Sequence, residues 1–408
     1  MEYISENLNT PIYGEYDVII VGGGPAGCGA AIACGRRGLK TLIIEKFNCL
    51  GGAWTVGLIN PFFDAKGKAG IVNELLIELD EKNQWGGFGD ISFNYEYMKV
   101  ILERKMIEAN VEILYNTVFS KAITEENTVK GVVFENINGR CAAFAKIVID
   151  CTGDGNVASN AGCEFELGEN GDYKVCQAMT LMFLVGNIPE KYKKGLMIFE
   201  KLKNVYEQGG KELPFKVPYL IPVPNSHFGV VQFTHMYEHD PLNAKALTNA
   251  IMEGRQQIID AFEFLTKYDK EFENLELITS SSVLGVRESR RIIGEYYITE
   301  EDILYGAKFD DAVAYVTFGA DLHTKSNKGQ RCFKVQPYNI PMRALIPKGY
   351  DGIVVAGRCI SGSREAMASY RVTGDCAQMG ESAGYYIAEA IKQKISLLDV
   401  KLRLKLTV

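Results

Sequence analysis

A glycine-rich turn between a short apolar strand and an Ala-rich helix constrains the fold of this chain most strongly. Residues 16–21 read as a buried strand, Gly22–Gly27 fit the pattern G-x-G-x-x-G, and residues 25–37 read as a helix. Residues 40–44 form a second apolar strand that ends at Glu45. Nearly continuous apolar strands on both sides of a helix predict a βαβ unit in a parallel sheet that is covered on both faces.

The spacing of this turn meets the physical demands of a dinucleotide site. Gly22 permits the tight turn, Gly24 lets the backbone approach a pyrophosphate, and Gly27 lets the helix pack closely on the strand. The first N–H groups of the helix hold phosphates without lysines. Glu45 lies 18 residues after Gly27, where a carboxylate accepts hydrogen bonds from ribose hydroxyls and disfavours a 2′-phosphate.

The same kind of pattern returns at the far end of the chain. A strand is expected at 352–356, a turn at Gly357-Arg358 and a helix at about 373–392. A helix at 93–109 and strand-like segments at 111–118, 129–135 and 141–149 precede the middle of the chain, and the last segment runs into an Asp-x-Thr-Gly-Asp turn. These features favour FAD over NAD, since an NAD domain is normally one compact N-terminal block.

Residues 165–345 differ from both ends. They mix alternating strands at 218–236 and 313–319, one helix at 242–268 and long polar connectors, and they contain all four histidines. We therefore predict an α/β fold with a Rossmann-like FAD-binding domain that is split in sequence and carries an inserted α+β substrate domain with an antiparallel sheet. The expected domains are 1–164 and 346–408 for the cofactor, and 165–345 for the substrate.

A second pattern, G-x-G-x-x-A at residues 153–158, also follows a strand. The helix that it opens is expected to last only to about Gly162, which is too short for a crossover to a parallel strand. No built-in nicotinamide domain is therefore expected, and electrons should pass to or from a separate donor or acceptor.

An ordered series of motifs resembles the FAD-dependent oxidoreductase family of the glutathione-reductase-like superfamily, from about residue 15 to 395. The motifs after the first are Leu50-Gly51-Gly52 with Thr55, Asp150-x-Thr152-Gly153-Asp154-Gly155, Arg287-Glu288-Ser289-Arg290-Arg291-x-x-Gly294-Glu295, Asp321-x-His323, Ile340-Pro341-x-Arg343-x-Leu345, Gly357-Arg358-Cys359-Ile360-Ser361, and Arg371-Val372. Cys151 departs from the family, which usually has alanine there, and a passive thiol is the preferred interpretation.

The resemblance implies FAD as the cofactor and assigns most of its contacts. Gly52 would run beside the flavin phosphate and ribitol, and Val118 would hold adenine through its backbone. Arg358 and Arg371 would line the ribitol and pyrimidine end. The full set of expected cofactor residues is Gly22, Gly24, Pro25, Ala26, Gly27, Glu45, Lys46, Gly52, Thr55, Val118, Thr152, Gly153, Arg358, Arg371 and Val372.

Catalytic candidates come from the inserted region, because flavin chemistry belongs to the cofactor and the protein orients substrate and moves protons. His323 suits a general acid or base near neutral pH, with a structural, backbone-bonded histidine as the alternative. Arg287, Arg290 and Arg291 form the densest cationic cluster, and guanidinium groups suit a carboxylate. Arg290 is the preferred member, and ion pairs to Glu288 or Glu295 at the domain interface are the alternative. Arg343 is a weaker candidate of the same kind.

His235 and His239 do not predict a metal site. Four residues along a strand span roughly 13 Å at ~3.3 Å each, so the two side chains would not converge on one ion. His235 alone remains a candidate that points toward the flavin from a covering sheet. The ten cysteines contain no C-x-x-C and are interpreted as buried reduced thiols.

Composition limits the partners. A net charge of −7 argues against nucleic acid, no apolar run approaches the ~18 residues of a membrane span, and the N-terminus lacks a signal peptide, so a cytoplasmic protein is expected. The expected function is hydride transfer between a small polar substrate and flavin; homo-oligomerisation is left open. The alternatives are an electron-carrying flavoprotein that docks a protein partner, and an NAD-binding relative of the thiazole-synthase type, which is shorter.

Overall fold

The computed structural model describes residues 4–87, 91–193, 199–325 and 331–408. Its parallel sheet contains the strands on both sides of the glycine turn. Strand β1 (Ile12–Val21) pairs in parallel with β2 (Thr41–Ile44), and α1 (Pro25–Arg36) connects them. Strand β3 (Glu112–Leu114) extends the sheet beyond β2. The carboxyl ends of these strands therefore meet at one edge, the usual position of ligands in open α/β sheets.

Strand β6 (Gly139–Asp150) lies inside one seven-stranded sheet and pairs with three other strands. It runs parallel to β1 along one side, and its last residues pair in parallel with β17 (Ile353–Val355), about 200 residues later in the chain. Its first half pairs antiparallel with β5 (Thr128–Asn136), which pairs with β4 (Val118–Glu125). The predicted split of the cofactor fold is thus seen directly in the pairing of β6 with β17.

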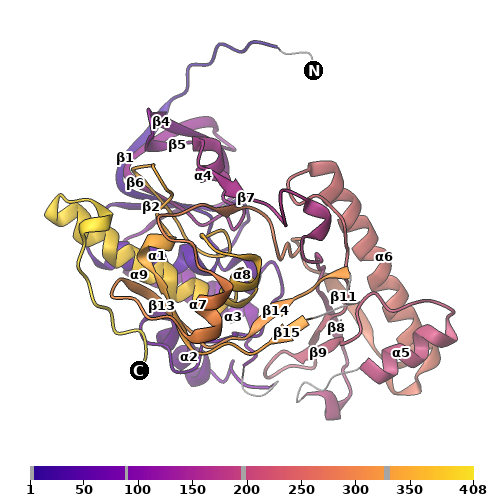
Figure 1. Cartoon of the computed structure of the whole chain (residues 1–408). Coiled ribbons are helices and arrows are strands. Elements are labelled where there is room, and N and C mark those ends of the chain that lie inside the picture. The colour runs from indigo at the N-terminus through magenta and orange to yellow at the C-terminus, as the bar shows by residue number, and fades with distance from the viewer. Residues whose placement is uncertain (1–3, 88–90, 194–198, 326–330) are drawn as a thin grey trace.

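The two halves of this fold are also joined by helices that approach each other through glycine. Helix α9 (Thr373–Gln393) packs along α1 (Figure 1). A Cβ on Gly29 would lie 2.2 Å from the carbonyl oxygen of Ala377, and one on Gly380 would lie 2.0 Å from that of Ala26. Only glycine permits this backbone approach. Helices α2 (Ile71–Glu81) and α3 (Tyr95–Glu108) contact α9 and α1 respectively.

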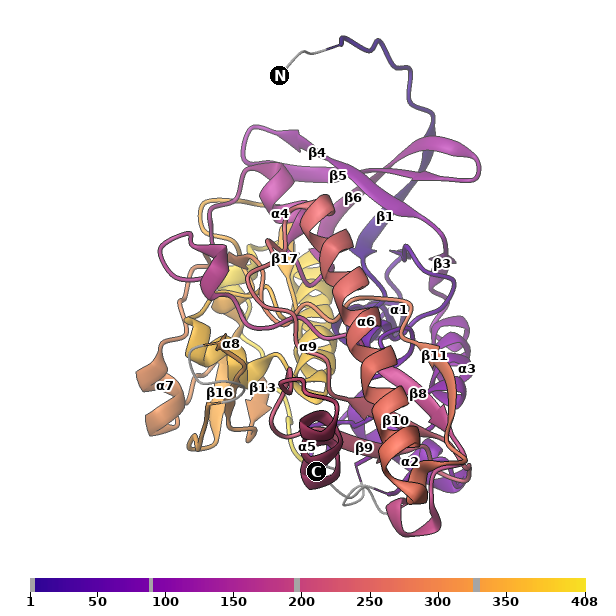
Figure 2. The ribbon, with the colours of Figure 1, turned by 90° about the vertical axis from the view of Figure 1, so that its right-hand side faces the viewer.

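An antiparallel sheet in the order β11-β8-β10-β9 forms the inserted region. The bounds of its strands are Glu276–Ser280 for β11, Phe183–Gly186 for β8, Gly229–Gln232 for β10 and Tyr219–Pro222 for β9. Helices α6 (Ala244–Tyr268) and α5 (Phe199–Gln208) lie on the side away from α1 and α9 (Figures 1 and 2).

Side chains of this sheet alternate between two environments, as the twofold period of a strand requires. Phe183 and Val185 pack into the core with α6, whereas Met182 and Leu184 pack on the opposite face with Leu58 of the cofactor fold. The second face therefore covers the nucleotide-binding part of the molecule.

Shorter elements complete the fold. They are α4 (Asn156–Ala161), α7 (Glu300–Tyr305), α8 (Arg364–Tyr370), and the strand pairs β7 (Phe165–Glu166) with β12 (Arg291–Ile292), β13 (Ala312–Val316) with β16 (Tyr338–Pro341), and β14 (Ala320–Leu322) with β15 (Arg331–Phe333). One core includes residues between 292 and 346 together with β1 and α1, and the second is built from residues between 179 and 284. The domain limits 164/165 and 345/346 stay a prediction.

Three expectations are corrected. The segment 111–118 is not one strand, because Asn116 has a φ of 49° and separates β3 from β4. The segment 218–236 is divided by a turn at Asn225, with a φ of 53°. The inserted region also contains α5 and α7 besides the one expected helix. None of the helices in the described part of the chain combines the length and apolar character that a membrane crossing needs.

Candidate functional site

One cavity of about 1760 Å³ lies between the carboxyl edge of the parallel sheet and the inner face of the antiparallel sheet. Sites for drug-sized ligands are usually ~300–1,000 Å³, so this cavity has room for a dinucleotide and a further small molecule. Thirteen of the fifteen expected cofactor residues line it, namely Gly22, Gly24, Pro25, Ala26, Glu45, Lys46, Gly52, Val118, Thr152, Gly153, Arg358, Arg371 and Val372. Gly27 and Thr55 lie behind its wall.

The glycine turn has the geometry of a phosphate cradle. Gly22 has a φ of 100°, and a Cβ on it would lie 2.6 Å from the carbonyl oxygen of Cys151. A Cβ on Gly27 would lie 1.9 Å from the carbonyl oxygen of Gly22. Around a Cβ on Gly24, by contrast, no described atom lies within 4 Å, so this backbone borders open space at the N-cap of α1. The open approach and the uncapped helix start fit a pyrophosphate.

Glu45 is held in place by backbone donors. Its Oε2 accepts a hydrogen bond from the N–H of Gly23 at 2.5 Å, and its Oε1 accepts one from the N–H of Phe47 at 2.9 Å. The carboxylate is therefore fixed at the end of β2, and it lines the cavity. Two carboxylate oxygens have about four lone-pair sites, so acceptor capacity remains for the predicted ribose hydroxyls.

Thr55 supports the cavity wall without lining it. Its hydroxyl donates to the carbonyl of Leu50 at 2.6 Å, and the N–H of Gly51 donates to the carbonyl of Gly23 at 2.7 Å. These bonds fix the loop of Gly51 and Gly52 against the glycine turn.

The turn after β6 closes on its own carboxylate. Asp150 is fully buried and accepts from the N–H groups of Val157 at 2.7 Å and Ala158 at 3.0 Å. These are the first N–H groups of α4, a helix of six residues. Burial raises the pKa of Asp150, although the hydrogen bonds act in the opposite direction. In this second glycine-containing turn, the chain itself thus occupies the place at the helix start where a phosphate would bind.

Arg358 forms an ion pair with Asp154 across the cavity wall, with 2.7 Å between Nη2 and Oδ1. Burial alone would raise the pKa of Asp154, but Arg358 and the Ser289 hydroxyl hold it below its usual value. At the start of α9, Val372 and Thr373 line the cavity, and no partner for the Thr373 hydroxyl is found among the described residues. This helix start is a second point where polar ligand atoms would be accepted.

Two buried histidines and a partly exposed aspartate form a hydrogen-bonded row on the inserted side. Oδ2 of Asp321 lies 2.9 Å from Nε2 of His323, whose Nδ1 lies 2.9 Å from Nε2 of His235. Phe215 stacks on His235 at 4.0 Å between ring centroids. Burial, followed by the charge of Arg287, lowers the pKa of His323 to about 4 and that of His235 well below its ordinary value. Both imidazoles are thus neutral at pH 7.

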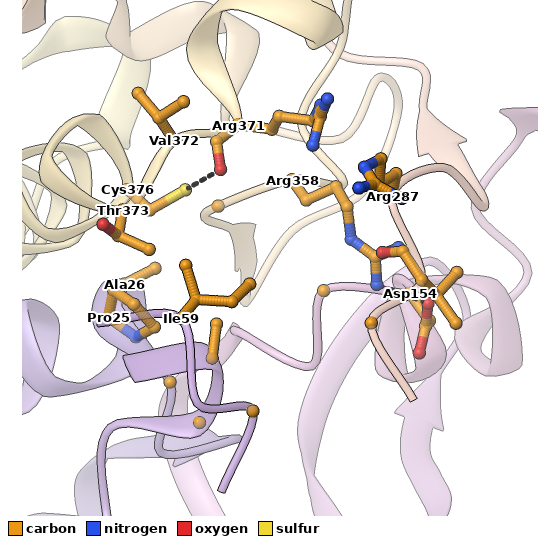
Figure 3. A pocket seen from close by; sticks show the side chains of 18 of the residues that line it. Pro25, Ala26, Ile59, Asp154, Arg287, Arg358, Arg371, Val372, Thr373 and Cys376 are labelled. Carbon is orange, nitrogen blue, oxygen red and sulfur yellow. Dashed lines mark hydrogen bonds and ion pairs between the residues drawn. The ribbon is translucent and has the colours of Figure 1, made fainter. Parts of the chain in front are cut away.

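Two guanidinium groups, those of Arg287 and Arg371, act on the pKa of His323 from nearby. Nη1 of Arg287 donates to the carbonyl of Ala178 at 2.7 Å and to the hydroxyl of Thr180 at 2.5 Å. Nη2 of Arg371 donates to the carbonyl of Asp321 at 2.8 Å. Figure 3 shows Arg287, Arg358 and Arg371 across the cavity from Pro25 and Ala26.

The structure does not bring all four catalytic candidates together. His323 lines the cavity and His235 lies directly behind it. Arg290 also lines the cavity, but its hydrogen bonds go to Asp154 at 3.1 Å and Asn156 at 3.2 Å, on the turn after β6. Arg343 is not among the residues lining the cavity. It pairs with Asp311 at 2.9 Å and stacks over Tyr296.

The other members of the arginine and histidine groups are engaged elsewhere. Arg291 pairs with Glu288 and Glu166, each at 3.1 Å, which is the expected alternative for this cluster. Nε2 of His239 lies 2.8 Å from Glu253. Within the residues that the structure describes, no group of three potential ligands could hold a metal ion.

All ten cysteines are free thiols, and nine are buried, as interpreted from the sequence. Cys332 is the exposed one; it lines the cavity, and its thiol lies 3.4 Å from Oδ1 of Asp321. Burial raises the pKa of Cys151 well above its ordinary value, so this thiol stays protonated.

Sequence reasoning missed the part of Arg287 in this site and the residues beneath it. Ala178 and Thr180 come from the chain before β8, and Phe215 from the segment before β9. Arg287 belongs to the same arginine cluster as Arg290 and Arg291, and nothing in the spacing of these residues distinguishes Arg287 from Arg290. Pairing of β8 with β10 and β11, together with the bridges Met179–Met236 and Thr180–Gly285, brings Ala178 and Thr180 close to the histidines.

Comparison with known proteins agrees with the geometry. The model of the family described as FAD dependent oxidoreductase matches residues 17–406. Thiamine thiazole synthase of Methanococcus aeolicus is 32% identical over 154 residues, covering 35% of this chain and 57% of the relative. Dihydrolipoyl dehydrogenase of Trypanosoma brucei brucei is 55% identical over 42 residues, covering 10% of this chain and 9% of the relative. This chain thus spans about half of one relative and about a tenth of the other.

Solved structures share the fold at low identity. The flavin-dependent brominase Bmp2 superposes with a TM-score of 0.53 at 14% identity, covering 93% of this chain and 80% of that protein. A geranylgeranyl bacteriochlorophyll reductase-like protein of Thermoplasma acidophilum gives 0.51 at 15% identity, with the same coverage. These likenesses concern the fold alone.

Proposed function

We propose that this chain, which belongs to the FAD dependent oxidoreductase family, transfers a hydride between a small polar substrate and its FAD, and exchanges electrons with a separate donor or acceptor. One observation carries the proposal. A single cavity is lined by the dinucleotide motif at Gly22 and Gly24 and also by Asp321, His323 and Arg287 of the inserted region. FAD, when bound, supplies the site that accepts or donates the hydride.

The cofactor would lie along residues that fit it. Gly24 and the start of α1 would hold the pyrophosphate, Glu45 the ribose, and the start of α9 the far end. The helix α4 is too short for a second nucleotide-binding crossover, which supports an external electron partner.

Proton movement would pass through Asp321. Both ring nitrogens of His323 are engaged, Nε2 by Asp321 and Nδ1 by His235, so neither is left to face a substrate. A carboxylate accepts, so Nε2 of neutral His323 carries the proton and its Nδ1 accepts from His235. Asp321 lines the cavity, and we assign it the exchange of a proton with the substrate. His323 would orient this carboxylate by donating from Nε2, and Asp321 itself would hold the proton that it exchanges with the substrate.

His235 would be a positioning residue. Its Nδ1 lies 3.4 Å from the carbonyl of Phe233, a long contact that suits a nitrogen without a proton. Addition of one proton to the pair would turn this contact into a donated bond. Burial lowers the pKa of both imidazoles, so at pH 7 His235 would act by fixing the tautomer of His323 and not by storing a proton.

Anaerobic stopped-flow reduction of the holoenzyme tests this proposal. The substrate panel holds sugars, hydroxy acids and amines, and the external partners are tested for reoxidation. With a substrate that bleaches the flavin, Asp321→Asn and His323→Gln should keep FAD bound and slow reduction by about 10²- to 10⁴-fold. The control is His239→Gln, which changes a histidine of the same region paired with Glu253.

Two results would contradict the proposal. Reduction at the wild-type rate in both variants would make the Asp321–His323 pair structural. Bleaching by a protein donor alone, with no small molecule active, would instead favour the electron-carrying flavoprotein.

A further inference from the structure

The cationic lining of the cavity contrasts with the acidic chain. Six cationic side chains line it, against three carboxylates, although the whole chain has a net charge of −7. The cations are Lys46, Arg287, Arg290, Lys334, Arg358 and Arg371, and the carboxylates are Glu45, Asp154 and Asp321. The cofactor's pyrophosphate accounts for two negative charges at the glycine turn, so the excess on the inserted side calls for another anion.

Arg287 carries this excess. Its hydrogen bonds go to two neutral groups, the carbonyl of Ala178 and the hydroxyl of Thr180, and it forms no ion pair with a carboxylate among the described residues. Burial, together with the nearby charge of Arg371, lowers the pKa of Arg287 to about 9. It therefore stays charged at pH 7 in a place that disfavours charge, an arrangement that an anionic ligand would relieve.

The nearby groups do not neutralise Arg287. Asp321 is the carboxylate on this side, and it is already bonded to His323 and Cys332 and lies 4.0 Å from Arg371. The two histidines are neutral, and Tyr237 is a phenol whose pKa is raised by burial. Two guanidinium groups thus share one carboxylate at this end of the cavity.

We propose that Arg287, with Arg371 beside it, binds a carboxylate of the substrate, so that the enzyme acts on a small carboxylic acid. The inference rests on the proposed function and names its substrate class. A guanidinium presents paired donors that match the two oxygens of a carboxylate, and Nη1 of Arg287 is already oriented by Thr180. Asp321 next to Arg371 then lies within the same site, where the substrate atom that gains or loses a proton would be held.

Binding to the oxidised holoenzyme tests the inference without turnover. Propionate and succinate are titrated against their amides, propionamide and succinamide, and the change in visible flavin absorption is followed. Both carboxylates should produce a saturable change, and the amides should produce none at the same concentrations. No hydride is transferred in this experiment. A failure of carboxylate binding can therefore be distinguished from a failure of the proposed hydride transfer.

Variants locate the site. Arg287→Gln should weaken carboxylate binding by about 10- to 100-fold and keep FAD bound, since charged hydrogen bonds of this kind are lost. Arg287→Lys keeps the positive charge and serves as a second variant in case Arg287→Gln does not fold. It should bind the carboxylates more weakly than wild type because it lacks the paired donors. Arg140→Gln, on β6 with its partner Glu135, should bind as wild type does.

Five results would overturn the inference. Four are equal binding of the amides, no saturable change with either carboxylate, unchanged binding in Arg287→Gln, and loss of FAD from Arg287→Gln, which would make the cofactor the partner of this guanidinium. The fifth concerns a different anion. Inorganic phosphate binding as tightly as succinate would show a general anion site in place of a carboxylate site.

Discussion

Two glycines two residues apart in the same turn should respond in opposite ways to alanine. At Gly24 the backbone is extended, with φ −72° and ψ −173°, and no described atom lies within 4 Å of an added Cβ. At Gly22 the φ is 100° and the Cβ would lie 2.6 Å from the carbonyl oxygen of Cys151. The first change therefore alters the cavity, and the second alters the fold.

The magnitudes follow from these geometries. Gly24→Ala should change the free energy of unfolding of the apoprotein by less than about 1 kcal/mol, since the entropy gained and the weaker helix cap are both small and opposite in sign. Its Cβ borders the pyrophosphate site, so FAD affinity should fall by about 1–3 kcal/mol. Gly22→Ala places a Cβ in a positive-φ conformation that L-residues disfavour, and this Cβ also clashes with the backbone of Cys151. The change should therefore destabilise the apoprotein by roughly 2–5 kcal/mol.

The assay must separate folding from binding, because bound cofactor itself stabilises the folded state. Urea unfolding is measured on apoprotein, and FAD content is measured by absorbance after gel filtration of reconstituted protein. An apo Gly24→Ala protein as unstable as Gly22→Ala would refute the geometric reasoning. Full FAD retention in Gly24→Ala would refute the placement of the pyrophosphate.

Four other outcomes are expected. Glu45→Ala should weaken FAD by roughly 1–3 kcal/mol, measured as occupancy after dilution and gel filtration, and unchanged occupancy would remove the ribose role. Denaturation should release intact FAD into the supernatant, since no Cys or His lies in a recognised flavin-linkage motif; a yellow pellet would show a covalent bond. Lys68→Met should lower the free energy of unfolding by about 3–5 kcal/mol, because Lys68 pairs with fully buried Asp375 at 2.7 Å; a smaller loss in urea titration would mean that the pair is not needed. Between pH 6.5 and about 4 the unfolded chain binds more protons at His323 than the folded protein does, so stability should fall on acidification by up to ~1.4 kcal/mol per pH unit, and less steeply in His323→Gln; equal slopes in urea titrations would contradict the low pKa.

The cofactor half of the fold was readable from the sequence because its signals are local. The turn at Gly22–Gly27 lies between neighbouring elements, and the helix expected at 93–109 agrees with the observed α3. Strand 352–356 could be placed because an apolar run, the Gly357-Arg358 turn and a following helix repeat the first strand-turn-helix pattern. The break at Asn116 could not, since this residue interrupts an otherwise strand-like run without a Gly or Pro. The break at Asn225 did have a signal, because Pro224 and Ser226 beside it are also typical turn residues.

The substrate side was less readable because it is assembled from distant segments. His235 and His323 are 88 residues apart, and the contact between them depends on how the antiparallel sheet packs on the cofactor fold. The sequence favoured Arg290 over Arg287. In the structure Arg287 donates to Ala178 near the histidines, whereas Arg290 donates to Asp154 on the turn after β6. The motifs gave several candidates within one stretch, and the three-dimensional arrangement shows which of them line the cavity.

The pairing of β17 with the distant strand β6 affects the order in which parts of this protein fold during synthesis on the ribosome. Residues 148–150 of β6 pair with β1 on one side but have no β17 on the other until residues 353–355 have been synthesised. Helix α1 stays without α9 until later still. At typical synthesis rates of ~5–20 residues per second, the first half of the nucleotide fold waits roughly 10–40 s for its second half. The inserted unit can fold during this delay, because its own core lies between residues 179 and 284. Nascent chains should therefore acquire protease resistance in that unit first, and the ability to retain FAD only near the end of translation.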